Sequence, residues 1–162
     1  MTRANSRKTT QKPRPAKLAA ARFDEIEIQC EQRGLRLTEM WREAYLLLAE
    51  KKAPLSAYDL LEGLEARVGR KLAPPTVYRA LDFLLEQGFI HRIASSSKYL
   101  TCDHPGEAHE SIYFMCSNCG TAREIEDTRI AKLLSEDASG VGFSPQRHVV
   151  EVQGVCKDCG TA

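Results

Sequence analysis

Apolar residues recur at helical spacing in four stretches of the first half of the chain. The first stretch begins at Phe23 and ends at Gly34, a residue type that suits the left-handed position after a helix. The next two begin at Thr38 and Ser56, whose side chains can cap the backbone N–H groups of a new helix. The fourth begins at Ala73, where two following prolines fix a helical start. The last two helices, joined by a tight connection, predict a helix-turn-helix.

Shorter apolar segments follow these helices and predict strands. Residues 89–93 and 98–102 flank a small polar stretch, Ala94-Ser-Ser-Ser, which is a hairpin signature. Helices followed by a hairpin indicate a winged helix-turn-helix. Beyond the hairpin, further elements are expected as strands at 111–115, 122–126 and 148–155 and as a helix at 128–138.

The pattern predicts an α+β fold class with four parts. They are a disordered basic tail (1–22), a winged-helix DNA-binding domain (23–101), a hinge (102–110) and a small α/β domain (111–162).

Charge gives the tail a distinct character. The chain has 162 residues and a formal net charge of +1, from 23 basic and 22 acidic side chains. Seven basic residues lie in the first 22 positions, which hold no acidic residue, so the remainder carries 16 basic against 22 acidic residues. Because neither domain is basic overall, any recognition of nucleic acid is expected to depend on a few placed contacts.

Length and hydropathy exclude several classes of protein. A chain of this size leaves no room for a large enzyme scaffold. Its longest apolar run, residues 44–49, is far shorter than the roughly 20 residues that span a bilayer, and its start has no apolar secretory core. We therefore expect a cytoplasmic protein with no membrane partner. In that reducing compartment, six cysteines are expected to be metal ligands or redox groups.

Four of the cysteines form two Cys-x-x-Cys turns, each followed by glycine. Cys116 and Cys119 make the first turn, and Cys156 and Cys159 make the second. Four thiolates at these spacings match a closed tetrahedral site, for which zinc is the default metal. The alternative, a redox dithiol, would occur once beside a strand-helix-strand pattern. The turns therefore predict structural zinc, which would also stabilise a unit of only about sixty residues.

Other side chains could also bind a metal. They are His91, Cys102, His104, His109, Glu124 and His148. Each has an ordinary explanation as a surface or capped histidine, a buried thiol or a solvated carboxylate. Four of them, on the hairpin, at the end of the hinge and on a later strand, could form a second tetrahedral site: His91, Cys102, His109 and Glu124. Spacing alone leaves that second site undecided.

Several motifs occur together in one order along the chain. They are the run from Pro74 to Phe89 with the following Ile-His, then Cys102, a histidine seven residues before Cys116, and both Cys-x-x-Cys turns. This combination resembles the ferric uptake regulator superfamily and, more narrowly, its zinc-sensing branch, the zinc uptake regulators. The resemblance covers about residues 25–160.

The resemblance implies a homodimer that binds double-stranded operator DNA, with 111–162 as an α/β dimerisation domain. It implies two zinc ions per monomer. The four cysteines of the two turns would hold the structural zinc, and the regulatory zinc would be held by His91, Cys102, His109 and Glu124. A further metal site using His104 or His148 stays open.

The resemblance also points to Tyr58, Tyr78 and Arg79 as DNA contacts. Arg79 lies three residues after Thr76 on the first turn of the predicted recognition helix, where its guanidinium can reach guanine O6 and N7. A half-buried ring is the competing explanation for Tyr78. The second helix departs from the family, because it starts Thr38-Glu-Met-Trp where the superfamily often has Thr-Pro-Gln-Arg, so phosphate contacts there are not carried over.

The predicted function is a zinc-responsive transcriptional repressor of zinc-uptake genes, with no enzymatic activity and no small-molecule substrate. A thiolate in the regulatory site favours zinc over iron(II) or manganese(II). One alternative keeps the fold and changes the signal to iron or thiol oxidation, with Cys102 or Cys30 as the reactive group. The other is a small zinc hydrolase using His91, His109 and Glu124, although no metalloprotease helix motif is present.

Overall fold

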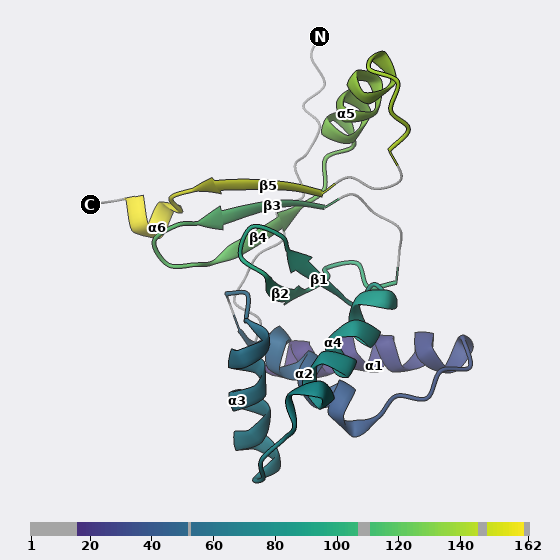
Figure 1. Ribbon diagram of the computed structural model, residues 1–162, viewed down its shortest axis with the longest axis vertical. Coiled ribbons are helices and arrows are strands. Elements are labelled where there is room, and N and C mark those ends of the chain that lie inside the picture. Colours follow the sequence, from purple (N-terminus) through teal and green to yellow (C-terminus); the bar gives the residue numbers. More distant parts are fainter. Residues whose placement is uncertain (1–15, 52, 107–110, 146–148, 161–162) are drawn as a thin grey trace. The chain divides into compact units, whose positions relative to one another are not determined.

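The computed structural model describes residues 16–51, 53–106, 111–145 and 149–160, which belong to two compact units (Figure 1). The first unit contains the described residues up to Gly106, and the second contains those from Ser111 onward. Among the described residues, no helix is long and apolar enough to cross a membrane.

Four helices and a hairpin make up the first unit, which we call the winged unit. They are α1 (Ala16–Gln32), α2 (Glu39–Glu50), α3 (Ala57–Val68), α4 (Pro74–Glu86), β1 (Ile90–Ile93) and β2 (Lys98–Thr101). The Thr38 side chain accepts the Trp41 N–H before α2, and Ser56 forms a capping box with Asp59 before α3. Prolines occupy the first turn of α4, and β1 pairs antiparallel with β2. The predicted winged helix-turn-helix is therefore confirmed.

Helix α1 begins seven residues before the start predicted at Phe23, so the prediction of a disordered tail is wrong over residues 16–22. This segment, Ala16-Lys-Leu-Ala-Ala-Ala-Arg, has no amphipathic pattern, but it consists of strong helix formers. Ala19 packs into the core with no exposed surface, which ties the extension to the winged unit. The rest of the predicted tail lies outside the described residues.

The core of the winged unit is apolar and includes side chains from every one of its helices. Its largest fully buried members are Tyr45, Phe23, Phe89, Ile26, Leu60, Leu64, Leu81, Leu84 and Ile90. Tyr45 lies inside this core, against the ring of Phe23. Trp41 is partly buried at the edge of the core, where its ring stacks on Phe83 of α4 with centroids 3.7 Å apart. Cys30 is a buried residue of the same core.

Residues that follow β2 are fixed to α1 within the winged unit. Arg22 forms an ion pair with Asp103 at 3.0 Å, and Gln29 donates to the Pro105 carbonyl oxygen at 3.1 Å. The segment 103–106 thus belongs to the winged unit, so the predicted hinge is shorter at this end. Residues 107–110 lie outside the described residues.

A three-stranded sheet and one long helix form the second unit. Its elements are β3 (Ser111–Cys116), β4 (Ala122–Ile125), α5 (Thr128–Gly140), β5 (Val149–Gly154) and the single turn α6 (Lys157–Gly160). The strand order is β4-β3-β5, with β4 antiparallel and β5 parallel to β3. The three strands and α5 lie within two residues of their predicted bounds, whereas α6 was not predicted.

Candidate metal centres

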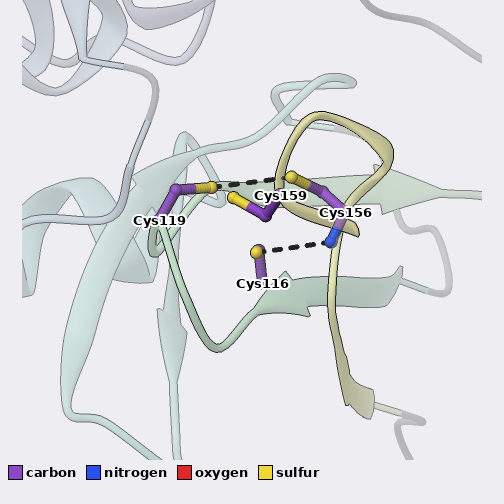
Figure 2. Close-up of side chains that lie close together, drawn as sticks. All are labelled: Cys116, Cys119, Cys156 and Cys159. Carbon is purple, nitrogen blue, oxygen red and sulfur yellow. Dashed lines mark hydrogen bonds between the residues drawn. The ribbon is translucent and has the colours of Figure 1, made fainter. Parts of the chain in front are cut away.

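The two Cys-x-x-Cys turns meet because β3 and β5 are parallel neighbours. Cys116 ends β3 and pairs with Gly154 at the end of β5, so the chain enters both turns side by side (Figure 2). In the first turn the Gly120 N–H donates to the Cys116 carbonyl at 2.9 Å, and Gly120 has a φ of 70°, which glycine adopts without steric cost. In the second turn the Cys159 N–H donates to the Cys156 carbonyl at 3.0 Å. The predicted four-cysteine cluster is therefore present.

The sulfur atoms of this cluster fit a tetrahedral zinc ion. All four lie within 4.8 Å of one another, and the sulfurs of Cys119 and Cys156 are 3.7 Å apart. Zinc–sulfur bonds of about 2.3 Å in a tetrahedron require sulfur pairs about 3.8 Å apart. None of these cysteines is in a disulfide. Donor type, number and spacing thus agree with a closed structural site.

The electrostatics of the cluster favour a bound cation. Backbone N–H groups of Cys119 and Cys156 lower the pKa of the Cys116 thiol to about 6, so this sulfur is ionised at neutral pH. Hydrogen bonding to the sulfurs of Cys156 and Cys119 raises the pKa of Cys159 to about 12, so this thiol keeps its proton. A divalent cation removes the repulsion between neighbouring thiolates, and its binding releases the remaining protons.

The winged unit brings together two of the residues predicted for a regulatory site. His91 lies on β1 and Cys102 directly follows β2, and a ring nitrogen of His91 lies within 4.8 Å of the Cys102 sulfur. Both side chains are buried. The backbone N–H of His104 donates to the Cys102 sulfur at 3.3 Å, which fixes the position of that sulfur.

Glu124 lies on β4 of the second unit, where it is buried beside two hydroxyl groups. The Ser111 hydroxyl donates to its Oε1 at 2.7 Å, and the Tyr113 hydroxyl donates to the same oxygen at 3.4 Å. These two partners were not predicted, because nothing in the sequence fixes the register that sets Tyr113 opposite Glu124. His109 and His148 lie outside the described residues.

The residues predicted to contact DNA lie on α3 and on the first two turns of α4. Tyr58 exposes 66% of its surface and Tyr78 exposes 52%, which for Tyr78 suits either of its two explanations. Arg79 is exposed and Thr76 is half-buried. The opposite face of α4 packs into the core through Val77, Ala80, Leu81 and Leu84. Helix α4 therefore presents Tyr78 and Arg79 away from its apolar face.

Comparison with known proteins decides the family. The model of the ferric uptake regulator family matches residues 32–153. The chain belongs to this family. It is 41% identical over 134 residues to the zinc uptake regulation protein of Escherichia coli K12, an alignment that covers 80% of this chain and 76% of that protein. It is 30% identical over 129 residues to the zinc uptake regulation protein of Mycobacterium tuberculosis H37Rv, which covers 78% of this chain and 95% of that protein.

Solved structures agree with this family relation. A zinc uptake regulator in complex with zinc and DNA matches with a TM-score of 0.81 and 36% identity, over 87% of this chain and 94% of that chain. The crystal structure of holo XcZur matches with a TM-score of 0.78 and 38% identity, over 91% of this chain and 100% of that chain. Because members of this family are transcription regulators, the small zinc hydrolase is excluded.

Proposed function

We propose that this chain is a zinc-responsive transcriptional repressor that binds operator DNA as a zinc-loaded homodimer and represses zinc-uptake genes. The observation that carries the proposal is the buried pair of His91 and Cys102. It gives the DNA-binding unit metal donors of its own, outside the four-cysteine cluster. The zinc uptake regulators of 36 to 41% identity support the same signal and the same DNA partner.

The proposed zinc content is two ions per monomer. Cys116, Cys119, Cys156 and Cys159 hold the first, which stabilises the second unit. His91, Cys102, His109 and Glu124 hold the second, which is the regulatory ion. Its donor set of two nitrogens, one sulfur and one oxygen favours zinc over iron(II), and four protein donors leave no position for a substrate. A third ion at His104 or His148 stays a prediction.

The proposed DNA contacts are Tyr58, Thr76, Tyr78 and Arg79. The exposed Arg79 guanidinium can read guanine in the major groove, and the N-terminal turn of α4 can face phosphates. We assign dimerisation to the second unit, because α5 has no buried residue and large apolar side chains near it are exposed, as are others on β5. They include Leu133, Val141, Phe143, Val149 and Val152. In a dimer, two recognition helices must reach successive major grooves about 34 Å apart.

In this proposal, zinc binds one arrangement of the two units more tightly than the others and so raises its population. Because the proposed regulatory ligands come from both units, an ion bound to all four selects the arrangement in which they converge. If that arrangement is also the one that binds DNA, zinc and operator raise each other's affinity by the same factor. When zinc is scarce, the weak overall charge of the domains leaves little non-specific attraction to retain the protein on DNA.

The experiment starts by selecting a binding sequence from a random duplex pool at buffered free zinc. The selected duplex and a scrambled duplex are then titrated with the wild type, Cys102→Ser and His91→Ala. We expect both variants to lose zinc-dependent binding and to remain folded dimers. Cys30→Ser, which changes a buried cysteine outside the site, should keep the zinc response. An unchanged response in Cys102→Ser and His91→Ala would contradict the assigned site.

A thiol-oxidation signal would require Cys30 or Cys102 to react with an oxidant, and the surroundings of both cysteines argue against this. Burial raises the pKa of the Cys30 thiol, which keeps it protonated and slow to react. Cys102 has no exposed surface, so an oxidant has no direct access to it. A peroxide challenge on the zinc-loaded protein distinguishes the signals, because a zinc sensor should retain DNA binding under mild oxidation.

A further inference from the structure

Three polar side chains are buried together on one face of the sheet in the second unit. Ser111, Tyr113 and Glu124 expose 2%, 1% and 5% of their surfaces. Ser111 and Tyr113 are two residues apart on β3, so their side chains lie on the same face. Tyr113 is directly opposite Glu124 on the antiparallel neighbour β4, which places all three side chains together.

Both hydroxyl groups donate to the same carboxylate oxygen. The Ser111 hydroxyl lies 2.7 Å from Glu124 Oε1, the usual length of a well-formed O–H···O hydrogen bond. The Tyr113 hydroxyl lies 3.4 Å from that oxygen, which makes it the weaker partner. Neither bond uses Oε2. The two hydrogen bonds therefore orient the Glu124 side chain through Oε1 and do not compete with a metal ion for Oε2.

This arrangement gives hydrogen-bond partners to a buried polar group and restricts the rotation of the Glu124 side chain. Burying a polar group costs free energy unless it is hydrogen-bonded, and the two hydroxyls supply these hydrogen bonds. Residues that hold a metal ligand in this way commonly change metal affinity by 10- to 100-fold when they are removed. Ser111 and Tyr113 have this relation to Glu124.

We propose that Ser111 and Tyr113 are positioning residues for Glu124 and that they set the zinc affinity of the regulatory site. This inference rests on the proposed function, in which Glu124 is a regulatory ligand. Ser111 has the larger effect, because its hydrogen bond is shorter. The two hydroxyls act on the regulatory site through Glu124, and the zinc affinity of the four-cysteine cluster is expected to stay unchanged.

The test is a double-mutant cycle on the full chain, with zinc affinity measured by competition against a chromophoric chelator. Ser111→Ala should weaken the regulatory zinc class by about 10- to 100-fold, and Tyr113→Phe by less. In a Glu124→Ala background, Ser111→Ala should have no further effect, because its partner is already gone. An equal loss of affinity in both backgrounds would show that Ser111 acts through general packing and would overturn the proposal.

Controls keep the result independent of folding defects. Ser139→Ala removes a hydroxyl of α5 that donates to the Ser135 carbonyl at 2.8 Å, and zinc affinity should not change. Ser111→Thr keeps the hydroxyl and should restore most of the affinity lost in Ser111→Ala. The electronic spectrum of Co²⁺ in the regulatory site should change in Ser111→Ala but not in Ser139→Ala.

Different results would contradict the proposed ligand set and the positioning role. If Glu124→Ala leaves the regulatory zinc affinity unchanged, the proposed ligand set and this inference are both wrong. If Glu124→Ala weakens zinc binding but Ser111→Ala and Tyr113→Phe do not, the ligand set stands and only the positioning role is wrong.

Discussion

The two units of this protein are stabilised by different means. The winged unit surrounds an apolar core, in which aromatic and aliphatic side chains such as Tyr45, Leu60 and Leu81 have no exposed surface. In the second unit, α5 contributes no buried residue, and the buried positions on the sheet include Cys116 and Glu124. The first unit can fold on hydrophobic burial, whereas the second, as we propose, depends on a metal and on a partner subunit.

This difference suits a sensor. A unit that must present a recognition helix needs a rigid core, and α4 is fixed through Val77, Leu81 and Leu84. A unit that must respond to zinc can be stabilised by a bound metal ion instead of by a large apolar core. The comparison therefore predicts that substitutions in one unit leave the other largely unchanged.

The largest effect is expected from Cys116→Ser in the four-cysteine cluster. A structural zinc site contributes on the order of 10 kcal/mol to folding, so the second unit should unfold. Hydrogen exchange of the full chain should show fast exchange in β3 and β5 and unchanged protection in α2 and α4. Cys30→Ala is the matched control, since it removes a core thiol and should keep the full zinc content. Loss of protection throughout the chain would contradict the independence of the two units.

A core substitution in the winged unit should have the next largest effect. Leu81 is completely buried, so Leu81→Ala should reduce the free energy of unfolding by about 2–5 kcal/mol while zinc content stays constant. Denaturant unfolding followed by Trp41 fluorescence reports on this unit, because the Trp41 ring stacks on Phe83 of α4. Leu133 is 58% exposed on α5, and Leu133→Ala should leave that transition unchanged.

The strand bounds, helix caps and cysteine turns could be predicted because each depends on residues close in sequence. Ser56 and Asp59 are three residues apart, and the capping box between them is present. The early start of α1 was missed because residues 16–22 have helix propensity without apolar periodicity. The parallel pairing of β3 with β5 and the hydroxyl partners of Glu124 depend on strand register, which no local signal fixes.

Arg79→Ala should weaken specific DNA binding by about 1–3 kcal/mol for each base that the guanidinium no longer reads. Metal content and stability should not change, because the side chain is exposed on α4. Fluorescence anisotropy with the selected and scrambled duplexes separates specific from non-specific binding. Arg129→Ala removes the same charge from the second unit, where Arg129 pairs with Asp127. An equal reduction in both variants would mean that Arg79 acts only through net charge.

Arg22→Ala tests how α1 holds the segment after Cys102. Its ion pair with Asp103 is mostly shielded from solvent, with side-chain exposures of 20% and 6%. We expect a loss of about 1–2 kcal/mol in the stability of the winged unit. The control is Lys71→Ala, which removes an exposed ion pair with Glu65 and should cost less than about 1 kcal/mol. Equal thermal shifts for the two variants would be inconsistent with a fixed segment.

The smallest effect concerns the capping box at the start of α3. Hydrogen bonds from Ser56 lower the pKa of Asp59, so the ionised carboxylate stabilises the folded winged unit. Because the folded pKa is the lower one, this contribution is present above the unfolded pKa of about 3.9 and is lost as the pH falls through the folded value. Asp59→Asn should therefore lower the free energy of unfolding of the winged unit at neutral pH. The difference in this free energy between the variant and the wild type should become smaller in strongly acidic solution. If this stability difference did not change with pH, the charge of Asp59 would not contribute to it.

The most direct test of a zinc-responsive repressor is one titration of the wild type with free zinc. Affinity for the selected duplex and zinc bound per monomer are measured in the same samples. We predict that one zinc per monomer resists mild chelation, and that DNA affinity rises over the free-zinc range in which a second zinc binds. DNA affinity that is constant across the filling of the second class, or the absence of a second class, would contradict the account.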